Sequence, residues 1–131
     1  MATIFSKIIN GELPSYKVAE SDEFYAFLDI NPIQEGHTLV VPKVEQDYLF
    51  DLGDIELQAF MVFSKKVALA IEKSITCTRI GVTVIGLEVP HAHIHLIPIN
   101  GINDMSFSKP KLDVSSDRMD EIQKSIASNF V

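Results

Sequence analysis

Three of the chain's four histidines alternate along one short segment, as His91, His93 and His95. The fourth, His37, stands in another apolar run far upstream. In an extended strand successive side chains point to opposite faces, so the three imidazoles share one face and the apolar residues between them face the core. Burying three imidazoles together costs desolvation that ordinary packing does not return. The spacing therefore predicts a functional site backed by a core.

Such a cluster can bind a metal ion or a phosphoryl group. Strand residues rise about 3.3 Å each, which puts the Cα atoms of His91 and His95 roughly 13 Å apart. Zinc–nitrogen bonds of about 2.0 to 2.1 Å leave little slack for all three rings to meet one ion, although His91 and His93 with His37 remain an alternative ligand set. A phosphoryl group presents several oxygens to separate imidazoles, and a neutral imidazole can attack it as a nucleophile. The row favours phosphate chemistry.

The elements that position these residues follow from hydrophobic periodicity. Apolar residues at spacings of three, four and seven predict an amphipathic helix over 54–74. A helical turn is expected at 3–9, and a serine cap at 115–116 begins a last helix that places Met119, Ile122 and Ile126 on one face. Extended runs rich in β-branched and aromatic residues predict strands. These runs are 16–19, 24–30, 37–42, 79–85 and the histidine segment after Pro90.

The expected fold class is therefore α+β, an antiparallel sheet of about five strands with one long helix packed on it and short helices at both ends. At 131 residues and 47% hydrophobic composition, the chain is long enough for one domain over 1–131. Residues 100–114 show no periodic pattern and are expected to form a long loop, so 100–131 is interpreted as a loop and C-terminal helix extension.

Charge and composition exclude several functions. Eleven basic and 18 acidic residues give a formal net charge of −7, which argues against binding nucleic acid or an anionic membrane over the whole surface. A phosphate ligand then requires local positive potential. The single cysteine, Cys77, cannot form an internal disulfide and is expected to be a buried small hydrophobe. The first residues lack a leader pattern, and we expect a cytoplasmic protein.

The segment from His91 to Ile97 resembles the signature of the histidine triad (HIT) family, in which alternate histidines are followed by apolar residues. The resemblance continues through residues 4–14, 26–30 and 36–43, in the order and spacing of the Hint-type branch. It implies a HIT-like fold and a nucleotide-binding hydrolase or transferase that cleaves at the α-phosphate of a nucleoside phosphoramidate or similar conjugate. The reaction passes through a nucleotidyl-histidine intermediate and needs no cofactor.

The same resemblance implies a role for each histidine. His93 is the expected nucleophile, and His91 supplies a backbone carbonyl that orients the other nitrogen of that ring. His95 and His37 are expected to contact the phosphate and its leaving group. It also implies a small-molecule nucleotide partner, with a purine expected, and a homodimer. Dinucleoside polyphosphate hydrolysis and non-catalytic nucleotide binding are the alternatives.

The resemblance also implies nucleotide contacts outside the histidines. Asp29 stands where the family keeps an acid that binds ribose hydroxyls, and its alternative is a turn residue at the end of a strand. Phe27 and Ile30 are expected to line the base pocket, although an aromatic residue in a strand also suits a core. The family uses backbone N–H groups around the position of Gly86 to hold phosphate, where a simple turn is the alternative.

Two departures from the family pattern stand out. Many bacterial relatives bind zinc with paired cysteines and a histidine, but Thr3, Ser6 and Glu45 occupy those positions here, so no structural zinc is expected. The loop before His91 is shorter than in the Hint branch, and its usual Asn-x-Gly sequence is missing. Leu87 and Glu88 replace hydrogen-bond donors there, so that Glu88 either approaches the phosphate, faces solvent or pairs with Lys43.

Overall fold

The computed structural model describes residues 2–131 and contains a five-stranded antiparallel sheet in the order β1-β2-β3-β5-β4. The strands are β1 (Lys17–Glu20), β2 (Phe24–Leu28), β3 (Thr38–Pro42), β4 (Arg79–Thr83) and β5 (Ile94–Ile99). The helices are α1 (Ile4–Ile9), α2 (Asp54–Ser74) and α3 (Ser116–Asn129), with 3-10 turns η1 (Leu49–Asp51) and η2 (Ile102–Met105). The expected α+β class is confirmed, and α2 has the bounds predicted from its periodicity.

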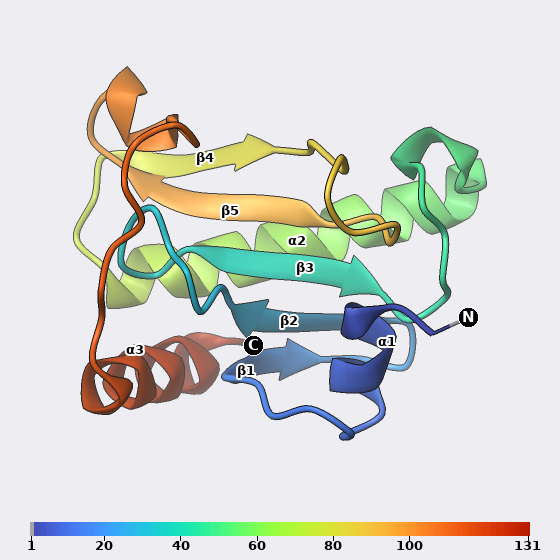
Figure 1. Cartoon of the computed structure of the whole chain (residues 1–131), viewed down its shortest axis with the longest axis horizontal. Coiled ribbons are helices and arrows are strands. Elements are labelled where there is room, and N and C mark those ends of the chain that lie inside the picture. The colour runs from blue at the N-terminus through green and yellow to red at the C-terminus, as the bar shows by residue number, and fades with distance from the viewer. Residues whose placement is uncertain (1) are drawn as a thin grey trace.

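The two faces of the sheet are covered by different helices (Figure 1). On one face α2 and α3 pack on the main core, to which β2, β3 and β5 contribute residues such as Leu28, Val40 and Ile94. On the other face α1 covers a second, smaller apolar cluster. This cluster contains Phe5, Tyr25, Phe27, Leu39 and Val41. The sheet therefore has a thick core behind it and a thin one in front.

Both terminal helices begin at hydroxyl caps. Thr3 accepts a hydrogen bond from the Ser6 backbone N–H at 3.0 Å, and Ser115 accepts one from Arg118 N–H at 3.2 Å. These bonds satisfy backbone donors that a helix leaves free in its first turn. The predicted face of α3 is confirmed, because Met119, Ile122 and Ile126 are all buried. This apolar face holds α3 against the sheet.

Residues 100–114, expected as a loop, contain η2 and then run across the end of the sheet to α3 (Figure 1). We call this segment the strap. Gly81 of β4 provides the room for η2, since a Cβ atom there would lie 2.5 Å from Met105 Sδ. Farther along, Leu112 N–H donates to the Pro32 carbonyl at 2.8 Å. The strap is thus attached at β4 and at the β2–β3 connection.

Candidate active site

The histidine segment is only partly a strand. β5 begins at Ile94, so His95 is within the sheet while His91 and His93 lie in the extended segment before it, which corrects the prediction of one histidine strand. Ala92 N–H donates to the Gln46 carbonyl at 2.7 Å, so this part of the segment bonds to a loop instead of a neighbouring strand. The predicted alternation still holds, because Ile94 belongs to the main core and the rings of His93 and His95 are 4.9 Å apart.

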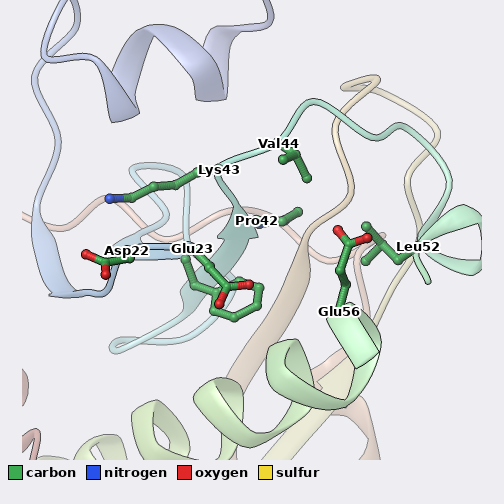
Figure 2. A pocket seen from close by; sticks show the side chains of 8 residues that line it. Asp22, Glu23, Pro42, Lys43, Val44, Leu52 and Glu56 are labelled. Atoms are coloured by element: carbon green, nitrogen blue, oxygen red, sulfur yellow. The ribbon is translucent and has the colours of Figure 1, made fainter. Parts of the chain in front are cut away.

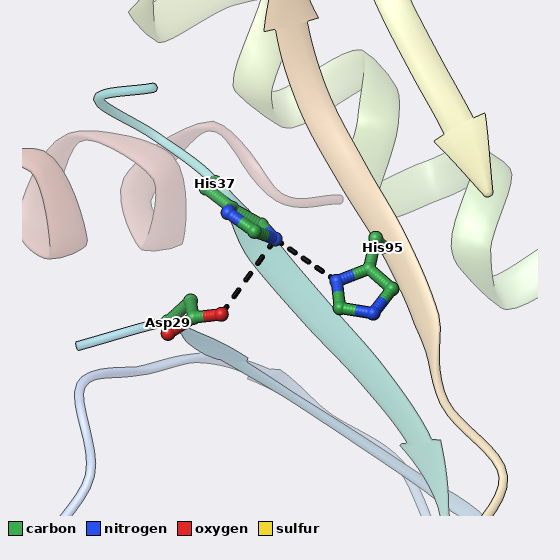
Figure 3. Close-up of side chains that lie close together, drawn as sticks. All are labelled: Asp29, His37 and His95. Carbon is green, nitrogen blue, oxygen red and sulfur yellow. Dashed lines mark hydrogen bonds and ion pairs between the residues drawn. The ribbon is translucent and has the colours of Figure 1, made fainter. Parts of the chain in front are cut away.

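His37 and His95 form a directed pair (Figure 3). Ile33 N–H donates to His37 Nδ1 at 3.2 Å, so the hydrogen of the neutral His37 ring is on Nε2. His37 Nε2 lies 3.0 Å from His95 Nδ1 and donates to it. The hydrogen of the neutral His95 ring is then on Nε2. A backbone amide therefore sets the tautomer of both rings.

His93 is oriented from the other side. Its Nδ1 lies 2.8 Å from the backbone carbonyl oxygen of His91, which can only accept a hydrogen bond. Nδ1 therefore carries the hydrogen and Nε2 keeps its lone pair. This is the contact that the family resemblance implied for His91. It leaves Nε2 of the His93 ring free of the backbone.

The second ring nitrogens of His93 and His95, Nε2 in both, are accessible to solvent. His93 and His95 are each 7% exposed, whereas His91 and His37 are 0% and 1% exposed. His93 Nε2 and His95 Nε2 have no hydrogen-bond partner within residues 2–131, yet every fully buried side-chain nitrogen and oxygen described has one, so these two atoms contact solvent. A lone pair and an N–H donor, from adjacent rings, therefore form the open face of the site. Both ring nitrogens of His37 are already used.

Burial keeps the His37 and His95 rings neutral near pH 7. It lowers the pKa of His37 to about 3 and that of His95 to about 4, and the neighbouring histidines and the charge of Lys111 act in the same direction. Burial also lowers the pKa of His91. Near neutral pH the tautomers derived from the hydrogen bonds are therefore the dominant forms.

His91 is held by residues at the N-terminus. Its Nε2–H donates to the Pro42 carbonyl at 2.7 Å, so its Nδ1 is an acceptor, and the Thr3 hydroxyl donates to it at 2.7 Å. Ser6 Oγ, next to Thr3, donates to the Glu45 carboxylate. Thr3, Ser6 and Glu45, which stand where zinc-binding relatives have their ligands, therefore form a hydrogen-bonded group in the folded chain. Two neutral hydroxyls are not zinc ligands, and this set does not fit a structural zinc ion.

Asp29 lies at the end of β2 and has two contacts. Its Oδ1 accepts the Asn31 backbone N–H at 2.8 Å, the turn contact considered from sequence, and its Oδ2 lies 3.7 Å from His37 Nε2 (Figure 3). Burial raises the pKa of this carboxyl. Asp29, His37 and His95 offer atoms within 4.8 Å of one another. The His37 tautomer disfavours a metal ion there, because its Nε2 carries a hydrogen where a ligand needs a lone pair.

The structure separates the two residues expected to line the base pocket. Phe27 is buried in the second cluster beside Phe5, with ring centroids 5.6 Å apart. Phe5 in turn contacts the His93 ring at 5.0 Å, a contact that the sequence analysis missed. Ile30 is 70% exposed and lines an open cavity of about 500 Å³ between β1 and α3. Phe27 is thus linked to the histidines through Phe5, while Ile30 lies apart.

In the loop before His91, the two residues that depart from the family pattern, Leu87 and Glu88, are exposed to solvent. Gly86 has φ of +73°, a backbone conformation that favours glycine, and Leu87 is 88% exposed. Glu88 is exposed too, and its charge acts on Asp29. Lys43 pairs with Glu20 at 2.8 Å, so of the alternatives considered for Glu88 the structure favours exposure to solvent over a pair with Lys43. Cys77 is half-buried, less than the sequence suggested.

The strap supplies two site residues that the sequence analysis missed. The ring of Phe107 lies 5.0 Å from the ring of His95 and 6.0 Å from that of His37. Lys111 Nζ lies 5.2 Å from the Phe107 centroid, and its charge acts on Asp29. Neither residue belongs to a periodic pattern, so only the folded chain brings them to the histidines.

A smaller cavity of about 130 Å³ lies at the opposite ends of β2 and β3 (Figure 2). Phe24 and Pro42 line it where these strands meet the first turn of α2, together with Leu52 and the carboxylates of Glu23 and Glu56. It contains no histidine. The phosphate chemistry predicted from the histidines belongs to the other site.

The fold and the paired histidines agree with comparisons to known proteins. The HIT domain family model matches residues 10–101, and the chain belongs to this family. An uncharacterised HIT-like protein of Borreliella burgdorferi is 37% identical and is covered over 97% of both chains. An adenosine 5'-monophosphoramidase of Saccharomyces cerevisiae is 41% identical over 98 residues, which are 74% of this chain and 62% of that protein.

Solved structures support the same fold. A Hit-like protein involved in cell-cycle regulation from Bartonella henselae superposes with a TM-score of 0.82 at 30% identity, covering 97% of this chain and 95% of that one. A hypothetical histidine triad nucleotide-binding protein from Sulfolobus tokodaii gives a TM-score of 0.82 at 28% identity, covering 96% and 90%. Within residues 2–131, no helix combines the length and apolar character needed to cross a bilayer.

Proposed function

We propose that the chain hydrolyses nucleotide conjugates at the α-phosphate, with His93 as nucleophile. The observation that carries this proposal is the open pair of nitrogens, a lone pair on His93 Nε2 beside an N–H on His95 Nε2. The name of the yeast relative supports nucleoside phosphoramidates as the substrate class. The yeast protein and this chain are 41% identical over 98 residues, which supports the same kind of site in both. A purine nucleotide is the expected ligand.

The first step forms a nucleotidyl-histidine. The lone pair of His93 Nε2 makes a bond to phosphorus as the bond to the leaving group breaks, and the leaving group keeps the bonding electrons. His95 Nε2–H donates a hydrogen bond to a phosphoryl oxygen or to the departing atom, while His37 holds the His95 ring. Water then attacks phosphorus, the phosphorus–nitrogen electrons return to His93, and a proton is released.

Other residues position the nucleotide in this proposal. Asp29 accepts hydrogen bonds from the ribose hydroxyls, and backbone N–H groups around Gly86 approach the phosphate. Phe27 acts through Phe5, which lies between it and His93. Ile30 directly follows Asp29 in the chain, and the proposal gives it a contact with the base only on the side of the open cavity that it lines, away from the histidines. We therefore expect the site to make stronger contacts with the ribose and phosphate than with the base.

The test is release of nucleoside monophosphate from an adenosine phosphoramidate. His93→Ala removes the nucleophile and is expected to lower kcat at least about a thousand-fold, a loss comparable to that of other essential catalytic groups. The side-chain hydrogen bond described for His93 goes to the His91 backbone carbonyl and to no other side chain, so circular dichroism should show a folded variant. Mass spectrometry of the quenched wild-type reaction should detect a nucleotidyl adduct on His93. Turnover by His93→Ala at the wild-type rate would refute the assignment.

A non-catalytic nucleotide-binding module is the second candidate. The exposed Glu88 favours it, because its charge acts on Asp29 and opposes an approaching phosphate. This function predicts binding of a nucleoside monophosphate without turnover in the wild type. Glu88→Gln distinguishes the two, since it should raise the rate of an enzyme that Glu88 slows and should leave a module inactive.

The remaining proposals concern the assembled protein. We propose a cytoplasmic homodimer in which residues 1–131 form one domain and 100–131 extend it. Exposed apolar residues on β4 and the following loop, Val82, Ile85 and Leu87, support a covered surface in solution. Sedimentation equilibrium checks this proposal, and a monomer at micromolar concentration would contradict it.

A further inference from the structure

The strap holds a cation beside the histidines. Two contacts place it: Lys109 Nζ donates to Gln34 Oε1 at 2.6 Å, and Leu112 N–H donates to the Pro32 carbonyl at 2.8 Å. Lys111 lies between these anchors. Both partners belong to the β2–β3 connection, which also carries Asp29 and leads into His37. The backbone around Lys111 is therefore fixed relative to the site.

The side chain of Lys111 is available to a ligand. Within residues 2–131 its ammonium makes no hydrogen bond or ion pair, and its close contact is the ring face of Phe107, at 5.2 Å from the centroid. Phe107 in turn rests its ring against His95 and His37. Lys111 is thus linked to the histidines through one aromatic side chain. An aromatic ring attracts a cation without neutralising it.

Without Lys111 the site, within residues 2–131, has carboxylates and neutral histidines but no positive charge to attract a phosphate. The chain has a net charge of −7, the carboxylates of Asp29 and Glu88 lie at the site, and burial keeps His37 and His95 neutral near pH 7. The positive charge of Lys111 acts on Asp29, His37 and His95 alike. It supplies the local positive potential that the composition of the chain lacks.

We infer that Lys111, held by Phe107, forms a subsite for a second phosphate, so that the site takes nucleotides with a phosphate beyond the one at His93. The inference rests on the proposed function for the position of the first phosphate. In this inference His93 Nε2 and His95 Nε2–H engage that α-phosphate, and Lys111, which the Phe107 ring links to His95, receives the next phosphate of a nucleoside diphosphate group. Lys111 then favours those substrates that have a phosphate in the leaving group.

Hydrolysis of such a substrate balances without a further reactant. The His93 Nε2 lone pair forms a bond to the α-phosphorus as the bond from that phosphorus to the bridging oxygen breaks. The bridging oxygen keeps the electron pair, and the second phosphate leaves as an anion stabilised by Lys111. Water then displaces His93 from phosphorus and releases one proton. A departing phosphate needs no proton from His95, which suits a ring that burial keeps neutral.

The test compares AMP and ADP by isothermal titration calorimetry at low ionic strength, where an exposed charge is least screened. Lys111→Gln should weaken ADP binding about ten-fold, because it removes a charge-assisted hydrogen bond, and should change AMP binding less than about two-fold. Lys111→Arg keeps the charge and should restore most of the ADP affinity. Lys66→Gln, an equal change of charge at an exposed position on α2, should affect neither ligand.

Each outcome separates the two proposals. If the wild type binds AMP and ADP and Lys111→Gln weakens both equally or neither, the second-phosphate subsite is refuted while the nucleotide site stands. If ADP alone loses affinity but His93→Ala hydrolyses a phosphoramidate normally, the subsite stands and the catalytic proposal fails. If the wild type binds neither nucleotide, both proposals are overturned.

Discussion

Lowering the pH from 7 to 5 should destabilise the folded protein through His37 and His95. Burial holds their pKa at about 3 and about 4 in the folded chain, against about 6.5 for an unperturbed histidine. The unfolded chain therefore binds more protons than the folded chain between these values, and stability rises with pH across this window. As pH falls below about 6.5, proton uptake favours the unfolded state.

The magnitude follows from the size of the window. One pKa unit corresponds to about 1.4 kcal/mol, and an unfolded histidine gains about 2 kcal/mol from protonation between pH 7 and pH 5, while these folded rings stay neutral. Two rings together give about 4 kcal/mol, a large part of the roughly 5–15 kcal/mol that stabilises a typical domain. Asp29 acts in the opposite direction, because burial raises its pKa.

Urea unfolding at pH 7 and pH 5 measures this difference. His95→Asn removes one titrating ring but keeps an oxygen near Nδ1 to accept from His37, so it should halve the pH-dependent loss, to about 2 kcal/mol. Ile94→Val is the matched control, since it destabilises the core by about 1 kcal/mol without changing the pH dependence. A wild type equally stable at both pH values, or an unchanged loss in His95→Asn, would refute the neutral-pair argument.

Two further predictions concern the supports of the site. Thr3→Val leaves His91 Nδ1 buried without its donor, which costs about 1–3 kcal/mol, and also removes the N-cap of α1, which costs about 1 kcal/mol. Thermal unfolding should show a clear loss that Thr76→Val, at an exposed position, does not, and equal melting temperatures would contradict both contacts of Thr3. Gly81→Ala puts a Cβ atom 2.5 Å from Met105 Sδ and should displace η2, which hydrogen exchange over 102–105 detects as faster exchange, whereas unchanged protection there would argue against this packing.

Periodic parts of the chain were predictable from the sequence. The bounds of α2 and the buried face of α3 follow from apolar residues at helical spacing, and Ser115 marks where α3 begins. Alternation also predicted correctly which side of the sheet His95 would face. These signals are local, because each depends on residues that lie within one or two helical turns or strand repeats of one another.

Contacts between distant segments could not be predicted in this way. The hydrogen bond from Thr3 to His91 joins positions 88 residues apart, and nothing near either residue indicates it. The same holds for Phe107, which reaches His37 and His95 from a segment without periodicity. The strand prediction failed at His91 and His93 because a loop carbonyl, that of Gln46, took the bond that a neighbouring strand would have made.

The strap has a consequence for how such a site diversifies. The family match spans residues 10–101, which include every histidine, but Phe107 and Lys111 fall after it. The strap can therefore change in sequence without changing the histidines, because its attachments at Gly81 and Pro32 do not pass through the rings. In the two proposals made above, reactivity belongs to the stretch that the family model matches and the second-phosphate contact belongs to the strap, so the two features can change independently.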